Sequence, residues 1–133
     1  MILGLGCDIA KVSRFAKESS FLQHFVKKYF TVSEIQELQE KIDCPEKGLV
    51  LEIATRFAAK EAVAKALGSG FRFGITLKDI EVLHDELGCP KVRLYNKALA
   101  RAYFVSNNQE FIMHITLSNE REYANAVAVL ESK

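Results

Sequence analysis

The sequence predicts a single α+β domain in which a mainly antiparallel sheet packs against a long central helix. A chain of 133 residues is long enough for one domain with a modest core. The hydrophobic pattern gives elements in the order β, α, α, α, β, β, α, β, β, with hairpin turns between successive strands. Hairpins that follow a run of helices are typical of α+β folds. No repeat or linker interrupts the chain, so we expect residues 1–133 to form one unit.

Composition argues against several classes of protein. The net charge of +1 gives no basis for binding nucleic acid or a membrane through bulk charge. No apolar run approaches the roughly 20 residues that span a bilayer, and no basic segment precedes the N-terminal apolar residues, so a signal peptide is not expected. Three scattered cysteines without a CxxC pair indicate free thiols, and hence a cytoplasmic location, rather than zinc or disulfides.

The first predicted element is a strand over residues 1–10. Its odd positions are apolar, whereas its even positions include Gly4, Gly6 and Asp8. Glycines inside a strand often mark the close approach of another backbone or a ligand. Asp8 would then be partly enclosed, and an enclosed carboxylate needs a donor, a cation or a metal. The simpler alternative is that Asp8 caps the turn that follows.

Two helices are predicted next. In residues 13–30, Phe21, Phe25 and Tyr29 recur at helical spacing. Such an aromatic face with basic neighbours can dock an acidic partner helix, although most aromatics of this kind belong to a core. The pattern Thr-Val-Ser-Glu at residues 31–34 is a capping box, which predicts a second helix to about Ile42.

The central helix is predicted over residues 45–67. A proline near its start and Gly68 after its end suit the two termini of a helix. On a helical wheel, Arg56 and Lys60 fall in the same arc as the apolar side chains, and buried cations need an anion. Glu61 lies four residues before Lys65, which is equally typical of an ordinary ion pair on a helix surface.

The remaining elements are a hairpin, a short helix and a second hairpin. The first hairpin joins strands at 79–83 and 91–95, and Asn96 caps the short helix. The last strands are expected at 111–118 and 123–130, followed by frayed residues. His114 shares one strand face with two hydroxyl side chains. A lone histidine is more often structural, but these neighbours favour a polar ligand.

Four motifs, in this order, closely resemble the holo-[acyl-carrier-protein] synthase family, the short-chain class of 4′-phosphopantetheinyl transferases. They are Asp8 after Gly-Leu-Gly-Cys, residues 56–70, residues 79–82 and residues 114–118. The resemblance extends from Met1 to Leu130. The chain departs from the family pattern in three places: a longer segment at 96–110, Asn119 where a second histidine is frequent, and Cys89 where lysine usually precedes proline.

The resemblance implies a 4′-phosphopantetheinyl transferase fold and a magnesium-dependent reaction. Phosphopantetheine would pass from coenzyme A to a serine hydroxyl of apo acyl carrier protein, releasing adenosine 3′,5′-bisphosphate in support of fatty acid biosynthesis. It also implies a homotrimer with active sites at the subunit interfaces. The implied roles are metal binding by Asp8 and Glu61, catalysis by Glu61, Lys65 and His114, coenzyme A binding by Arg56, Lys60, Lys65, Gly68, Ser69, Gly70 and His114, and carrier-protein docking by Arg14 and Phe25.

These residue types suit the chemistry independently of the resemblance. Attack on a pyrophosphate needs charge neutralised on both phosphates, and magnesium binds through one or two carboxylates plus phosphates and waters. Glu61, or a water that it orients, is the candidate base for the serine proton. Which cation meets which phosphate stays open. The rival interpretations are a non-catalytic coenzyme A or nucleotide-binding module and an adaptor for acidic helices, and neither explains the two carboxylates.

Overall fold

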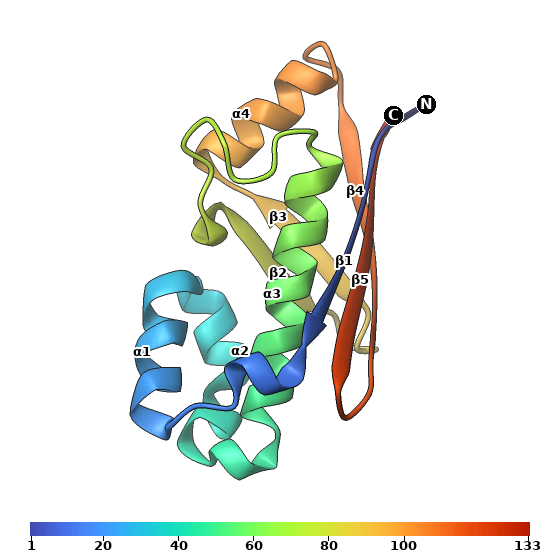
Figure 1. Cartoon of the computed structure of the whole chain (residues 1–133). Coiled ribbons are helices and arrows are strands. Elements are labelled where there is room, and N and C mark those ends of the chain that lie inside the picture. Colours follow the sequence, from blue (N-terminus) through green and yellow to red (C-terminus); the bar gives the residue numbers. More distant parts are fainter.

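Two antiparallel sheets and one central helix organise the computed structural model, which describes residues 1–133 (Figure 1). The larger sheet has the strand order β1-β5-β4, and the smaller one pairs β2 with β3. All pairings are antiparallel, as the sequence predicts. The strands are β1 (Ile2–Lys11), β2 (Ile80–His84), β3 (Pro90–Leu94), β4 (Phe111–Asn119) and β5 (Tyr123–Ser132).

The helix α3 (Leu49–Ala66) runs through the middle of the molecule. The larger sheet covers one side of it, and the other helices and the smaller sheet lie around the rest (Figure 1). Most of its side chains are therefore buried, including alanines that let neighbouring elements approach. The other helices are α1 (Ser19–Tyr29), α2 (Val32–Asp43) and α4 (Asn96–Val105), with short 3₁₀ turns η1 (Val12–Phe15), η2 (Pro45–Lys47) and η3 (Leu77–Asp79). None of these helices combines the length and the apolar character needed to cross a membrane.

The glycines of β1 allow the strand to lie directly against α3. A Cβ atom added at Gly4 would come 1.8 Å from the carbonyl oxygen of Ala66, and one at Gly6 would come 1.9 Å from that of Ala62. Only glycine fits such contacts with backbone. Of the two alternatives that these glycines leave open in the sequence, another backbone or a ligand, the structure shows a backbone, and the contact brings Asp8, two residues further on, to the side of the helix.

Several boundaries differ from the predicted ones. The helix expected over 45–67 is broken at Gly48, whose left-handed φ of 111° separates η2 from α3. Asn96 does not cap α4, because it has a φ of 49° and its side chain donates instead to Asp79. The C-terminus does not fray, since the backbone N–H of Ser132 donates to the carbonyl oxygen of Met1 at 2.9 Å. The capping box of α2 forms with both of its hydrogen bonds.

A candidate active site between β1 and α3

Asp8, Glu61 and Lys65 meet where the end of β1 lies against α3. The ammonium of Lys65 donates to Asp8 Oδ1 at 3.1 Å and to the carbonyl oxygen of Cys7 at 2.9 Å. Lys65 thus pairs with Asp8 across the two elements and not with Glu61 along its own helix. The Asp8 side chain does not cap the turn that follows, because η1 begins without a side-chain cap. The structure therefore shows neither a turn cap by Asp8 nor an ion pair between Glu61 and Lys65 along the helix, and instead places the three side chains in one cluster.

The pKa of the Glu61 carboxyl group is raised in this cluster. Burial raises its pKa, the negative charge of Asp8 raises that pKa further, and Lys65 and Arg14 act in the opposite direction. Two neighbouring carboxylates, one of which disfavours the charge of the other, form a good site for a dication. Magnesium binds through one or two carboxylates and takes its other ligands from phosphates and water. The pair Asp8 and Glu61 fits this pattern, and no group of three or more His, Cys, Asp or Glu offers a fuller metal cage.

A largely apolar cavity of about 470 Å³ opens beside Glu61. Its wall combines the end of α1 with the segment that follows α3, so side chains far apart in sequence converge on one carboxylate. The lining residues are Lys28, Tyr29, Glu61, Phe71, Ile75, Thr76, Leu77 and Lys78. Apart from Glu61, sequence reasoning did not assign these residues to the site, because only the packing of α1 against the loop brings them together.

The Gly-Ser-Gly segment turns the chain back over the end of α3. Gly68 and Gly70 have left-handed φ values of 75° and 59°, as the predicted cap requires. The N–H of Gly70 donates to the carbonyl oxygen of Ala64 at 3.0 Å, closing the last turn. The hydroxyl of Ser69 is buried and donates to the carbonyl oxygen of Gly70. The backbone N–H groups of Gly68 and Gly70 and the hydroxyl of Ser69 are thus already hydrogen-bonded within the chain, and contacts of this segment with coenzyme A stay predictions.

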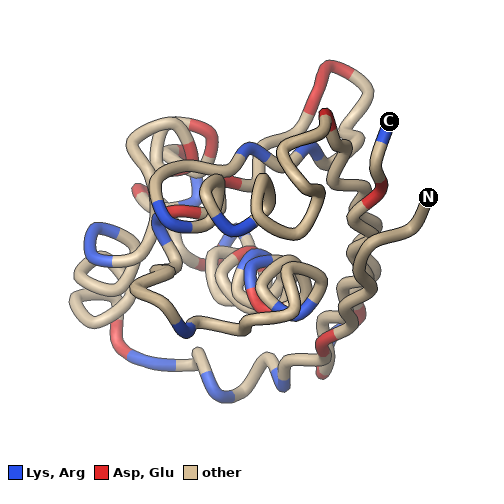
Figure 2. Tube along the Cα trace, turned by 90° about the horizontal axis from the view of Figure 1, so that it is seen from above, with Lys and Arg blue, Asp and Glu red and all other residues tan.

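Lys60 and Arg56 lie inside the molecule, in a buried ionic network. Figure 2 looks along α3 and shows its charged residues surrounded by the rest of the chain. The Lys60 ammonium donates to Glu34 at 2.7 Å and to the carbonyl oxygens of Leu77 and Ile80, which uses all three of its donors. Lys60 has no free N–H group in this arrangement, so a contact between Lys60 and a coenzyme A phosphate, which stays a prediction, would have to replace one of these hydrogen bonds.

Arg56 has one donor nitrogen without a hydrogen bond. Its guanidinium donates to Glu37 and to the carbonyl oxygen of Val82, whereas its Nε is buried without a hydrogen-bond partner and lies 3.8 Å from a carboxylate oxygen of Glu52. Arg56 lines a cavity of about 290 Å³, in which His84 also lies. A contact between Arg56 and a coenzyme A phosphate stays a prediction, and it would have to compete with Glu37.

Replacing Lys60 with methionine should destabilise the fold strongly. The Glu34 carboxylate, fully buried, would lose its ammonium partner and keep Arg56 only at 3.9 Å. Breaking one side of a buried pair typically costs about 3–5 kcal/mol of unfolding free energy. Urea unfolding measures this loss. In the double variant Lys60→Met with Glu34→Gln, part of the stability should return, and equal losses in the single and double variants would contradict the pairing.

His114 lies away from this cluster, on the opposite face of the larger sheet. The strand positions of β4 alternate, and His114 points to the same uncovered side as Leu5 and Ile9 of β1, which are 67% and 61% exposed. Its Nε2 atom is 2.7 Å from a carboxylate oxygen of Glu131. It also lines a cavity of about 530 Å³ between β3 and β4, together with Lys91 and Arg93. One chain therefore does not bring His114 to Glu61.

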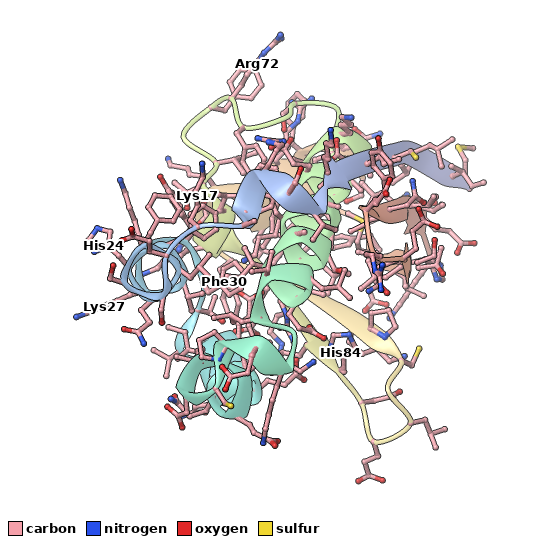
Figure 3. The ribbon with its side chains drawn as sticks, turned by 60° about the horizontal axis from the view of Figure 1, so that its bottom comes forward. Lys17, His24, Lys27, Phe30, Arg72 and His84 are labelled. Atoms are coloured by element: carbon pink, nitrogen blue, oxygen red, sulfur yellow. The ribbon has the colours of Figure 1, made fainter.

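Arg14 and Phe25 lie on a basic and aromatic surface, here called the α1 surface. The guanidinium of Arg14 stands over the rings of Phe15 and Phe57, at 5.5 and 5.4 Å from their centroids. Phe25 is half-buried and lines a cavity of about 220 Å³ on α1. The α1 surface comprises Arg14, Lys17, Phe21, His24, Phe25, Lys27 and Lys28. Figure 3 shows Lys17, His24 and Lys27 pointing outward, whereas Phe30 points inward toward α3.

Comparison with known proteins places this geometry in a family. The model of the 4′-phosphopantetheinyl transferase superfamily matches residues 4–128. The holo-[acyl-carrier-protein] synthase of Clostridium beijerinckii is 42% identical over 132 residues, which cover 99% of each chain. The crystal structure of the Neisseria meningitidis holo-[acyl-carrier-protein] synthase is 33% identical, with a TM-score of 0.78 over 99% of this chain and all of that one. The Bacillus anthracis synthase in complex with CoA (3′,5′-ADP) is 32% identical, with a TM-score of 0.76 over 100% and 99% of the two chains. Because the match spans the strand that carries Asp8, the helix that carries Glu61 and Lys65, and the strand that carries His114, the chain belongs to the 4′-phosphopantetheinyl transferase superfamily.

Proposed function

We propose that this protein transfers 4′-phosphopantetheine from coenzyme A to a serine hydroxyl of apo acyl carrier protein. The observation that carries the proposal is the cluster of Asp8, Glu61 and Lys65 at one end of an apolar cavity, in a chain of this superfamily. A binding module for coenzyme A would need cations and an apolar wall, but it would gain nothing from two adjacent carboxylates. The reaction supports fatty acid biosynthesis, and the three free thiols suit the reducing cytoplasm in which we place it.

The chemistry assigns a role to each side chain of the cluster. The serine oxygen forms a bond to the phosphorus that carries pantetheine, the bond from that phosphorus to the bridging oxygen breaks, and adenosine 3′,5′-bisphosphate leaves. Glu61 accepts the serine proton directly or through a water. Lys65 donates to a phosphate oxygen. Magnesium, held by Asp8 and Glu61, would supply neutralisation of the diphosphate charge.

The cavity beside Glu61 is proposed to take the pantetheine arm. Its volume of about 470 Å³ is typical of a pocket for a small ligand. The arm is a long chain in which methylene and methyl groups alternate with two amides and a hydroxyl, and its apolar groups suit a wall that includes Tyr29, Phe71 and Ile75. With the diphosphate beside Glu61, the arm would extend along this wall.

A homotrimer would complete the site. The outer face of β1-β5-β4 is uncovered in one chain (Figure 1); it exposes the apolar side chains of Leu5 and Ile9, and it carries His114. In a ring of three chains, each contact joins two different surfaces. The outer face of one chain could thus bring its His114 to the Asp8 and Glu61 of a neighbour. This arrangement gives a reason why a predicted catalytic histidine lies on the wrong face for its own chain.

Mixing two inactive variants should restore activity if the site is shared. Glu61→Gln and His114→Ala chains, unfolded together and refolded as mixed trimers, would form sites with Glu61 from one variant and His114 from the other. Random assembly makes about a quarter of the sites intact, so about a quarter of the wild-type rate is expected. Refolding each variant alone is the control. If mixtures stay inactive although sedimentation shows trimers, both residues act within one chain or His114 has another role.

The α1 surface is proposed to bind the carrier protein. Its cations Arg14, Lys27 and Lys28 would complement an acidic helix, and Phe25 would supply an apolar contact. Arg14 lies close enough to Glu61 to lower the pKa of that carboxyl group, so a partner bound here would be adjacent to the site.

Intact mass measurement tests the function directly. Apo acyl carrier protein is incubated with this protein, coenzyme A and magnesium, and a parallel sample contains a chelator. A gain of one phosphopantetheine that chelation prevents is the expected result. If two different carrier proteins gain no mass while coenzyme A still binds, the binding-module interpretation is correct.

A further inference from the structure

Arg101 of α4 connects three segments at the end of α3. Its Nε donates to the carbonyl oxygen of Leu67 at 3.1 Å. Its guanidinium carbon lies 5.3 Å from the ring centroid of Phe73 and 5.2 Å from that of Phe104, so the cation is within cation–π range of both rings. No carboxylate pairs with it, and Leu67 is its single hydrogen-bond partner. The arginine thus joins α4, the end of α3 and the loop that follows.

That loop, residues 68–76, is anchored at both ends, since the N–H of Gly70 donates to the carbonyl oxygen of Ala64, Ile75 is buried and Thr76 forms a capping box with Asp79, but its middle, residues 72–74, has few other restraints. Gly68, Gly70, Phe73 and Gly74 all have left-handed φ values, of 75°, 59°, 59° and 79°. For a bulky residue such as Phe73 this region is sparsely populated, and it persists only where the surroundings impose it. The core does not impose it, because Phe73 is 69% exposed. Between residues 71 and 75, one backbone hydrogen bond, from Ile75 to Arg72, lies within the loop.

The same loop forms one wall of the cavity beside Glu61, through Phe71, Ile75 and Thr76. We propose that Arg101 is a positioning residue for this wall: it holds residues 68–76 in the conformation that receives the pantetheine arm, without contacting the substrate itself. This inference rests on the proposed function, in which the cavity binds that arm. A preformed wall lowers the ordering cost of binding, so Arg101 would act on coenzyme A affinity and not on the chemical step.

A second chemistry is possible for the same side chain, and the experiment has to separate the two. The Nη2 atom of Arg101 lies 3.6 Å from where a Cβ on Gly68 would be, next to the Gly-Ser-Gly backbone. From there a guanidinium could contact a nucleotide phosphate directly. If Arg101 contacts a phosphate, its loss would lower the affinity for coenzyme A and for adenosine 3′,5′-bisphosphate alike. If Arg101 only positions the wall, its loss would lower the affinity for coenzyme A alone, because the bisphosphate lacks the pantetheine arm.

The decisive variant is Arg101→Gln, with Arg101→Lys and Arg72→Gln beside it. Arg101→Lys keeps a cation that can stack on the rings and donate to Leu67. Arg72→Gln removes the same charge from the loop itself, but Arg72 points into solvent (Figure 3) and makes no side-chain hydrogen bond or ion pair. In Arg101→Gln, the KM for coenzyme A should rise about fivefold to tenfold with kcat within about twofold. Arg101→Lys should recover part of this change, and Arg72→Gln should show none.

Two measurements that do not require turnover complete the test. Hydrogen exchange of residues 68–76 should accelerate in Arg101→Gln, whereas the Kd of adenosine 3′,5′-bisphosphate should stay unchanged. An unchanged exchange rate would show that Arg101 does not restrain the loop. Faster exchange with normal coenzyme A affinity would show that this restraint plays no part in coenzyme A binding. An equal loss of bisphosphate affinity would identify Arg101 as a phosphate ligand instead. If the wild-type protein transfers nothing to a carrier, the proposed function fails, but exchange and coenzyme A binding still decide the role of Arg101.

Discussion

Replacing Glu61 with glutamine should lower kcat about a hundredfold or more while leaving the folded chain at least as stable as the wild type. Glutamine keeps the shape of the side chain but removes the charge that the proposed function assigns to metal binding and the oxygen that it assigns to accepting the serine proton. General acid–base catalysis alone contributes about 10²–10⁴ in rate. Mass gain of the carrier protein measures kcat, and thermal unfolding in chelator measures stability. Glu122→Gln is the matched control, since this exposed glutamate lies in the turn before β5 and its side chain makes no hydrogen bond or ion pair.

The expected stability follows from the sign of the pKa shift. The pKa of Glu61 is raised in the folded chain by burial and by Asp8. Between the unfolded and folded pKa values the folded state binds the proton more tightly, so the unfolding free energy falls as pH rises through this range. Glutamine does not ionise, so the variant does not undergo this fall in unfolding free energy. Its melting temperature near neutral pH should therefore equal or exceed that of the wild type. Near-normal turnover in the variant would exclude Glu61 as both metal ligand and base.

The same shift predicts where metal binding weakens in acid. In the proposed function, Glu61 binds magnesium as an ionised carboxylate. Because the pKa of Glu61 in the metal-free chain lies above the ordinary glutamate value, magnesium affinity should begin to fall at a higher pH than an unperturbed carboxylate would give. Asp8→Asn removes one cause of the shift, so the pKa of Glu61 should fall toward its usual range in that variant. An NMR titration of the wild type and of Asp8→Asn, without metal, measures the pKa of Glu61 in each protein directly.

The parts of the site that the sequence predicts are those fixed by local pattern. Alternation in β1 places Gly4, Gly6 and Asp8 on one face whatever the rest of the chain does, and the structure sets that face against α3. The helical wheel shows that Arg56 and Lys60 need anions. It does not show that the anions come from α2, because that depends on how two helices pack.

The parts that the sequence does not predict depend on tertiary arrangement. Glu34 has a clear local role in the capping box of α2, and this signal conceals its second role as the buried partner of Lys60. The periodicity of β4 groups His114 with its hydroxyl neighbours but gives no means of telling which face of the sheet they occupy. The cavity beside Glu61 is built from α1 and from the loop after α3, so no single segment carries a signal for it.

Replacing Gly6 with alanine should destabilise the protein by about 3 kcal/mol or more, a large share of a typical domain's stability. The new Cβ would lie 1.9 Å from the carbonyl oxygen of Ala62 and 2.7 Å from the backbone N of Ala66. These are backbone atoms of a buried helix, so no side-chain rotation relieves the contact and β1 must move away from α3. Asp8 would move with the strand, so kcat should fall as well, since a misplacement of about 1 Å can cost a hundredfold.

The origin of this effect can be separated from a general loss of strand or helix propensity. Urea unfolding is measured for Gly6→Ala, for Ala62→Gly and for the double variant. Ala62→Gly removes a methyl group but leaves the carbonyl oxygen, and it costs about 1 kcal/mol through helix propensity. The unfolding free energies lost in the two single variants should therefore add in the double variant, and Ala62→Gly should not restore the stability lost through Gly6→Ala. Rescue would mean that side chains and not backbones set the distance between β1 and α3. A Gly6→Ala chain as stable as the wild type would mean that the strand and helix are not held at the distance that brings Asp8 to Lys65, and the candidate site would lose its structural basis.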